Sequence, residues 1–386
     1  MNVDIESGES KGTRDKPVDL KLYPKHGGRK MELSRVLNIP ADEILDFSAS
    51  VNPLGPSPEI SGALKEMGSL LAEYPEPGSL SFCEKVAGHL KIPSDWILAT
   101  NGSSELIHLL PKLIEAGKEA LILTPCFSEY ERSFTLSRIH CHTLDYQADS
   151  LFRMNLEEVM EYLERHPEIK MLVLGNPNSP AGHLCNEQSL AGLNSYCQSR
   201  KILLVVDEAF IEFCGEQNSV LKWLPKNRYL IVVRSMTKFY GLAGIRLGYG
   251  VMHSHLKAQL ARHQIPWSVN ALASGMGVLA LEDEAHSART RKAVDEQREF
   301  LFLELNAMKA LRVFPSQTNF LLFNLLSDSL EEAHQFYEAL LIAGILIRNC
   351  GNFTGLGENY FRVSVRTSTE NQKLVSGFKA YFQQGA

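Results

Sequence analysis

Four short apolar runs constrain the fold of this chain more than any other feature of its sequence. They are EALILTP (119–125), KMLVLGNP (170–177), KILLVVDEA (201–209) and YLIVVRS (229–235). Runs that are apolar on both faces and end in turn or polar residues are typical of parallel strands covered by helices. Helical patterns at 156–166 and 187–200 lie between them. This βαβ alternation predicts a parallel or mixed sheet, with ligand-binding groups at the carboxyl ends of its strands.

The pattern changes after Asp283, where a long charged helical stretch (287–310) precedes alternating strands at 318–325 and 360–367. A chain of 386 residues is long enough for two domains, and the change indicates that the second is α+β. The segment before Glu73 is rich in Pro and Gly, and we expect it to cross back to that second domain. The predicted division is a disordered leader at 1–20, an N-terminal arm with part of the small domain at 21–73, a large domain at 74–283 and a small C-terminal domain at 284–386.

Composition and charge exclude several classes of protein. A net charge of −6 argues against a protein that coats nucleic acid. No apolar run approaches the roughly 18 residues of a membrane span, and the polar N-terminus has no apolar signal core, so we expect a cytoplasmic protein. The seven cysteines are scattered without a C-x-x-C pair. They indicate reduced, mostly buried thiols, and we expect no metal site.

Asp207 comes directly after the third apolar run, in VVDEAF. A carboxylate at a buried strand end is costly unless it meets a cation or a strong donor. One interpretation is a helix cap or an ion pair. The other is a partner for a protonated pyridine nitrogen, which would keep such a ring electron-poor.

Two further segments could hold an anion. ATNGSSELIHLL (99–110) is a turn that opens a helix, and it exposes the amides of Gly102, Ser103 and Ser104, where free N–H groups and the helix dipole converge. RSMTKFYGLAGIRLGYG (234–250) adds Ser235, Lys238 and Arg246. Lys238 is either an ordinary solvated lysine or the covalent anchor of a phosphorylated aldehyde. If the two turns meet in space, Ser235 and Arg246 could close on the same phosphate.

Two more strand ends carry aromatic and amide side chains. TPCFSEY (124–130) offers Phe127, which either packs in the core or lies flat on a heteroaromatic ring. GNPNSPAG (175–182) offers the short polar side chains of Asn178 and Ser179 in a turn fixed by proline.

These features follow one another along the chain in a definite order: the anion-binding turn, the aromatic residue, the Asn/Ser turn, the aspartate, Ser-x-x-Lys and the arginine. The order resembles the fold-type I enzymes that depend on pyridoxal 5′-phosphate (PLP), the aspartate aminotransferase superfamily. The resemblance implies a large domain with a mostly parallel seven-stranded sheet between helices, plus a smaller α+β domain. It implies that Lys238 binds PLP covalently and that Ser235 and Arg246 hold the phosphate. It also implies a homodimer, because Tyr74 in EYPEPGSLSF matches a tyrosine that such enzymes lend to the neighbouring subunit's PLP phosphate.

NPNSPAG, DEAF and FRVSVRTSTEN are most similar to the histidinol-phosphate aminotransferase branch. Within that branch, residues 25–55, 266–273 and 345–368 resemble the threonine-phosphate decarboxylases of the cobalamin pathway. This implies a small phosphorylated amino acid as substrate and its decarboxylation, with no nucleic-acid or membrane partner. The chain departs from the common aminotransferase pattern at Ser179 and Phe210, which leaves open which group donates to the phenolic oxygen of PLP.

The residues expected to bind this substrate come from both ends of the chain. The fork of Arg362 suits a carboxylate, and Arg348 in LIRNC could meet a phosphate. His26 and the amide of Gly27 are further candidates for the phosphate, and Asn52 for orienting the substrate. Without the resemblance, each arginine would be interpreted as part of a surface ion pair. The alternatives to the decarboxylase are a histidinol-phosphate or related aminotransferase, a serine-phosphate decarboxylase and a non-catalytic ligand-sensing module.

Overall fold

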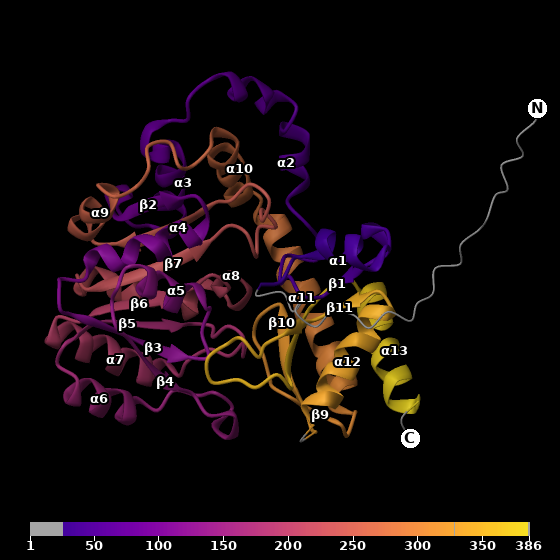
Figure 1. The fold of residues 1–386 in the computed structure, drawn as a ribbon. Coiled ribbons are helices and arrows are strands. Elements are labelled where there is room, and N and C mark those ends of the chain that lie inside the picture. Colours follow the sequence, from indigo (N-terminus) through magenta and orange to yellow (C-terminus); the bar gives the residue numbers. More distant parts are fainter. Residues whose placement is uncertain (1–25, 328, 385–386) are drawn as a thin grey trace, which may run out of the picture.

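The computed structural model describes residues 26–384 except residue 328. The leader predicted at 1–20 lies outside the described residues. The chain forms a large sheet and, beside it, two small sheets (Figure 1). The strands are β1 (Leu45–Asp46), β2 (Ile97–Thr100), β3 (Glu119–Thr124), β4 (Cys141–Asp145), β5 (Ile169–Gly175), β6 (Leu203–Asp207), β7 (Leu230–Ser235), β8 (Gly248–Met252), β9 (Leu311–Val313), β10 (Phe320–Leu325), β11 (Ile345–Leu346), β12 (Arg348–Asn349) and β13 (Tyr360–Ser364).

The large sheet has seven strands in the order β2-β8-β7-β6-β5-β3-β4. The strands from β7 to β4 run parallel, and β8 and β2 pair antiparallel at the other side. The four apolar runs form β3, β5, β6 and β7, as predicted. Because these four strands are parallel, the segments that follow them meet at one edge of the sheet.

Both faces of the large sheet are buried. Successive residues of one strand belong to different core clusters, as Leu172 and Val173 do on β5. Because side chains alternate along a strand, this division places one cluster on each face and explains why the runs lack polar residues. The α-helices of the described residues are α1 (Lys30–Leu37), α2 (Pro58–Ala63), α3 (Leu80–Leu90), α4 (Gly102–Leu109), α5 (Glu129–Leu136), α6 (Leu156–Arg165), α7 (Glu187–Arg200), α8 (Ile211–Cys214), α9 (Ser254–Ala261), α10 (Ala271–Glu282), α11 (Glu284–Asn306), α12 (Leu330–Ile342) and α13 (Ser368–Gln384).

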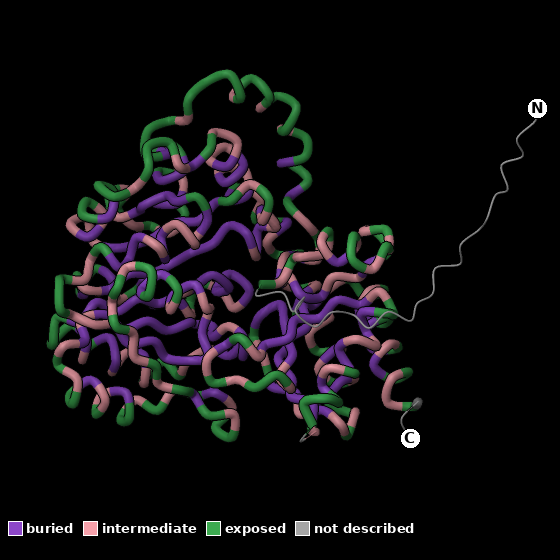
Figure 2. Tube along the Cα trace, viewed as in Figure 1, coloured by how far each residue is buried: buried purple, intermediate pink, exposed green. Residues whose placement is uncertain are grey.

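The C-terminal part contains the antiparallel sheet β12-β13-β10-β9, packed with α11, α12 and α13. The N-terminal arm joins this part, because β1 pairs in parallel with β11 and Phe47 accepts a hydrogen bond from the amide of Ser364. Figure 2 shows buried segments running through both parts. The fold class is therefore as predicted, a mostly parallel seven-stranded sheet between helices with a smaller α+β part. The domain bounds remain a prediction.

Among the described residues, no helix combines the length and apolarity that crossing a membrane requires.

Candidate active site

A cavity at the carboxyl ends of the parallel strands brings together most of the predicted site residues. The predicted residues that line it are His26, Gly27, Ser103, Phe127, Ser179, Asp207, Lys238, Arg348 and Arg362. They come from the N-terminal arm, the strand ends of the large sheet and the antiparallel sheet. Residues far apart in the sequence therefore share one site, as the order of motifs implied.

Lys238 follows β7 and is buried close enough to Arg362, Arg246 and Asp207 for their charges to act on its amine. Its Nζ has no hydrogen-bond partner among the described residues and lies 5.7 Å from the centre of the Phe210 ring. Burial, with the nearby guanidinium groups of Arg362 and Arg246, lowers the pKa of Lys238 to about 8. An amine with this pKa is partly neutral near pH 7, so it can act as a nucleophile or carry a proton.

Asp207 ends β6, and two donors hold its carboxylate. The hydroxyl of Tyr130 donates to Oδ2 over 2.8 Å, and the amide of Ala209 donates to Oδ1 over 2.9 Å. Burial raises the pKa of Asp207, while these two hydrogen bonds and the Lys238 charge oppose the shift. An aspartate fixed in this way can accept a hydrogen bond from a protonated ring nitrogen. Sequence reasoning missed Tyr130, although it stands in the same TPCFSEY segment as Phe127.

The two turns that could hold an anion meet in space. Gly102 opens α4 with φ +72°, and a Cβ on it would lie 2.7 Å from Nη2 of Arg246. A Cβ on Gly248 would lie 2.4 Å from the amide nitrogen of Ser103, so β8 and the start of α4 are in close contact. Ser235 is buried, and its hydroxyl is 2.7 Å from that of Thr237. Ser103 lines the cavity, whereas Gly102, Ser104, Ser235 and Arg246 do not.

Two arginines enter the cavity from the antiparallel sheet. Arg362 donates to Ser179 Oγ over 3.3 Å and to the carbonyl of Ser48 over 3.4 Å, and its buried Nε has no partner within the described part of the chain. Burial lowers the pKa of Arg362 to about 10. Arg348 donates to Asn352 Oδ1 over 2.5 Å. The interpretation of Arg362 as half of a surface ion pair is wrong, since it is 8% exposed and pairs with no carboxylate among the described residues.

Glu129 holds the N-terminal arm against the cavity. Its Oε1 lies 3.0 Å from Nε2 of His26, and its Oε2 lies 3.0 Å from Nε2 of His108 and 3.1 Å from Nη1 of Arg132. A Cβ on Gly27 would lie 2.1 Å from the carbonyl oxygen of Ser48, so only glycine lets the arm pass this close. Glu129 was not anticipated. No local pattern links it to His26, which is 103 residues away.

Besides Gly102, Ser104, Ser235 and Arg246, three more predicted residues do not line this cavity: Asn52, Asn178 and Tyr74. Asn52 is buried, and its amide group bonds to the carbonyl of Phe239, the hydroxyl of Thr290 and the amide of Leu54. Its own N–H donates to the carbonyl of Lys238 over 2.9 Å, so Asn52 supports the lysine turn instead of facing the cavity.

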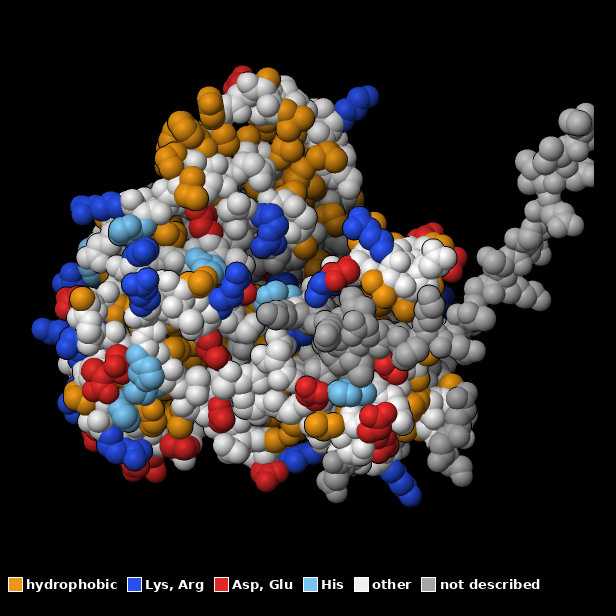
Figure 3. Space-filling view, viewed as in Figure 1, with side chains coloured by type: hydrophobic (Ala, Val, Ile, Leu, Met, Phe, Trp, Pro, Cys, Tyr) orange, Lys and Arg blue, Asp and Glu red, His pale blue; other side chains and the backbone are white. Residues whose placement is uncertain are grey.

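Asn178 is also fully buried, with its side chain bonded to the carbonyl of Pro125 and the amide of Ala181. Tyr74 is 81% exposed and packs on Trp267, with ring centres 4.7 Å apart. Figure 3 shows apolar side chains gathered in this region, at the top of the molecule.

The cavity residues fit PLP. A lysine without a hydrogen-bond partner can bind the aldehyde, a buried aspartate can bind the ring nitrogen, and the start of α4 with Arg246 can bind the phosphate. Ser179 and Phe210, the two residues that depart from the common aminotransferase pattern, both line the cavity.

The sequence pattern of the family "Aminotransferase class I and II" matches residues 42–378. The chain is 33% identical to a threonine-phosphate decarboxylase of Salmonella typhimurium, over 92% of this chain and 95% of that protein. It is also 33% identical to a histidinol-phosphate aminotransferase of Symbiobacterium thermophilum, over 89% of this chain and 92% of that protein. The crystal structure of a histidinol-phosphate aminotransferase from Clostridium acetobutylicum superposes with a TM-score of 0.82 at 27% identity, over 88% of this chain and 100% of that one. The chain therefore belongs to the class I and II aminotransferase family, whose fold is the fold-type I of PLP-dependent enzymes.

Proposed function

We propose that this protein decarboxylates L-threonine O-3-phosphate to (R)-1-amino-2-propanol O-2-phosphate and CO₂, as a step of cobalamin biosynthesis. The observation that carries the proposal is the pair Arg348 and Arg362, which enters the cavity beside the His26–Gly27 arm. This arrangement offers cationic and amide donors to a small substrate that is anionic at both ends. The similarity to the Salmonella protein supports the same reaction.

The residues of the cavity divide into those that hold PLP and those that hold the substrate. Lys238 would bind the aldehyde carbon and Asp207 the pyridine nitrogen, and Phe127 would lie against the ring. The amides of Gly102, Ser103 and Ser104 would bind the phosphate together with Ser235 and Arg246. PLP, when bound, accepts the electron pair of the bond that breaks at the substrate Cα.

The substrate-binding residues decide which bond at Cα breaks. In this proposal Arg362 binds the carboxylate, while Arg348, His26 and the Gly27 amide bind the phosphate. A substrate held at both ends keeps one main freedom, the rotation about its N–Cα bond. Decarboxylation requires the C–COO⁻ bond to stand perpendicular to the PLP ring, whereas transamination requires the C–H bond there. The residues that bind the substrate phosphate therefore determine whether the substrate is decarboxylated or transaminated.

Lys238 also supplies the proton that completes the reaction. When CO₂ leaves, the electron pair of the broken bond is the pair that bound PLP would accept, and a proton must then be added at Cα to complete the product. With the substrate amine at the aldehyde, the Nζ of Lys238 would be a free amine, and its pKa, lowered to about 8, would let it hold that proton and deliver it to Cα.

A histidinol-phosphate aminotransferase is the second candidate, favoured by a relative of that name at the same identity as the decarboxylase. A serine-phosphate decarboxylase would use the same residues, since one methyl group changes binding by only about 1–3 kcal/mol.

Product analysis separates these candidates. The purified enzyme with PLP is incubated with threonine phosphate, serine phosphate or histidinol phosphate, each with and without 2-oxoglutarate. Release of CO₂ and aminopropanol phosphate without any keto acid supports the proposal. Consumption of histidinol phosphate only with 2-oxoglutarate, and no CO₂ from threonine phosphate, would assign the protein to the aminotransferases.

A further inference from the structure

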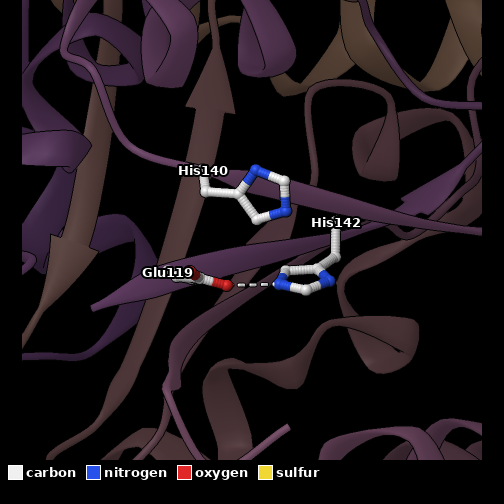
Figure 4. A group of neighbouring side chains, drawn as sticks. All are labelled: Glu119, His140 and His142. Atoms are coloured by element: carbon white, nitrogen blue, oxygen red, sulfur yellow. Dashed lines mark hydrogen bonds and ion pairs between the residues drawn. The ribbon is translucent and has the colours of Figure 1, made fainter. Parts of the chain in front are cut away.

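We infer that the chain carries a binding site for a divalent transition-metal ion, formed by Glu119, His140 and His142 at the amino ends of β3 and β4. Figure 4 shows the carboxylate of Glu119 pointing at the His142 ring, with the His140 ring beside them. The ligand atoms of the three residues all lie within 4.8 Å of one another. Sequence reasoning predicted no metal because it considered only the spacing of cysteines.

The backbone places the three side chains on one face of the sheet. His140 and His142 are two residues apart in an extended segment, so their side chains point to the same side. The carbonyl of His140 accepts a hydrogen bond from the amide of Ala120, and His142 pairs with Leu121. Glu119, two residues before Leu121, therefore points to the same face as both histidines. The site results from strand register and needs no loop to close over it.

Glu119 and His142 share a hydrogen bond in the metal-free protein, and a bound metal ion would replace it. Oε2 of Glu119 lies 2.5 Å from Nε2 of His142, and the rings of His140 and His142 are 4.6 Å apart. Bond lengths of about 2.0–2.2 Å to the metal place ligand atoms roughly 3.3–3.6 Å from one another in a tetrahedral site. Small side-chain rotations would reach this spacing, because His140 is exposed and Glu119 and His142 are partly exposed.

His142 has the outer partner that metal-binding histidines usually have. Its Nδ1 lies 2.9 Å from the hydroxyl of Tyr162, so Nδ1–H can donate to that oxygen while the Nε2 lone pair faces the ion. Two imidazoles and one carboxylate suit Zn²⁺, and also Co²⁺, Ni²⁺ and Cu²⁺, with water in the remaining positions. His166 and Glu168, 3.0 Å apart, form a second group with His142. The surroundings therefore hold additional ligands of the same kind.

The position of the site indicates a structural role. β4 is an edge strand that pairs only with β3. The site lies at the amino ends of these strands, whereas the cavity lies at the carboxyl ends of the parallel strands, so the metal takes no part in the reaction. A bound ion would link the edge strand to its neighbour and stabilise the folded state, because the ligands come together only there.

Zinc titration of the untagged, chelator-treated holoenzyme by calorimetry tests this inference. We expect one site per subunit and a higher melting temperature with zinc. Glu119→Gln and His142→Ala should each weaken zinc binding by at least about 10-fold, and Tyr162→Phe by about 10-fold. His89→Ala, which removes an exposed histidine of α3, is the matched control and should bind zinc as the wild type does.

Hydrogen exchange adds a readout that a fortuitous surface ion would not change. Zinc should slow amide exchange in β4 of the wild type and not of Glu119→Gln, with decarboxylation unchanged in both. The inference is overturned if zinc binds no more tightly than millimolar. It is equally overturned if His142→Ala and Glu119→Gln bind zinc like the wild type, or if alkylation of the thiols abolishes the binding.

Discussion

Arg348 on β12 and Arg362 on β13 stand directly opposite each other in an antiparallel pair of strands. They are 3% and 8% exposed, and both line the cavity. Like charges in opposite positions on adjacent strands destabilise a sheet, and burial increases that cost. An anionic ligand would remove it. The pair therefore indicates that this part of the chain is adapted to a bound anion at some expense to the stability of the empty protein.

Replacing either arginine should damage catalysis more than folding. We expect Arg348→Met and Arg362→Met to lower kcat/KM for threonine phosphate by about 10- to 150-fold, the equivalent of ~1.5–3 kcal/mol for a lost charge-assisted hydrogen bond. Arg348→Met should also lower kcat, because it loses orientation as well as affinity. Arg366→Met is the matched control, since Arg366 pairs with Glu370, and it should stay within about 3-fold. Equal losses in all three variants would contradict the assignment.

Much of the fold followed from the sequence because its signals are local. The four apolar strands and the helix at α7 are set by patterns within about ten residues of each other. The positions of Lys238, Asp207 and Arg362 could be predicted because each stands in a recognisable motif.

Asn52 was expected to orient the substrate, but its side chain bonds to the protein outside the cavity, and the reason is physical. A short amide near the site can satisfy its hydrogen bonds either with a ligand or with the backbone, and only the packing of Phe239 and Thr290 decides. The Glu129–His26 contact depends on tertiary structure in the same way.

Tyr130→Phe tests whether the hydroxyl keeps Asp207 ionised. The hydrogen bond from Tyr130 lowers the pKa of Asp207 against the effect of burial, so its loss should raise that pKa further. Activity needs the carboxylate, and the acid limb of the kcat/KM profile should therefore move to higher pH. Tyr146→Phe is the control, because the buried Tyr146 hydroxyl has no partner in the portion of the chain that the structure describes, and Tyr146 does not line the cavity. A Tyr130→Phe profile that superposes on that of Tyr146→Phe would remove Tyr130 from the site.

Gly102→Ala should weaken PLP binding. Its φ of +72° disfavours any side chain, and the added Cβ would press on Arg246. We expect PLP affinity to fall about 5- to 30-fold, the equivalent of ~1–2 kcal/mol of left-handed strain. Gly117→Ala has a similar φ of +74° and no atom within 4 Å of the new Cβ. It should lower the melting temperature without changing the PLP titration. Equal PLP affinity in both variants would argue against a phosphate at this turn.

Glu212 should make the protein less stable as the pH rises from about 4.5 to 7. Burial raises its pKa to about 7, and no described residue hydrogen-bonds to its Oε2, although Arg234 pairs with Oε1. A folded-state pKa above the unfolded value gives stability at low pH that is lost as the pH rises through the folded pKa. Glu212→Gln, which stays neutral, should therefore gain stability relative to the wild type between pH 5 and pH 8. Urea unfolding at the two pH values checks this, and a constant difference would contradict it.

The exposed Tyr74 leads to the prediction that each active site is shared between two subunits. Leu71, Tyr74, Ile265 and Trp267 are all more than half exposed, and the rings of Tyr74 and Trp267 are in contact. Figure 3 shows apolar side chains gathered at the top of the molecule, where Figure 1 places the segment between α2 and α3. Exposed apolar side chains that gather on one surface can form an interface, and in a symmetric dimer the same surface serves both subunits.

Lys238→Ala and Tyr74→Ala should each be inactive as pure proteins, the first for want of the amine and the second because Tyr74 reaches the phosphate of the other subunit's PLP. Mixed after reversible dissociation, they should regain activity. In a mixed dimer, one site combines both lesions and the other has an intact Lys238 and an intact Tyr74. Random pairing makes half of the dimers mixed, so about a quarter of the wild-type activity should return. Sedimentation of each variant confirms that dimers form. Active mixtures are impossible if Tyr74 serves its own subunit, because every site would then carry one of the two lesions.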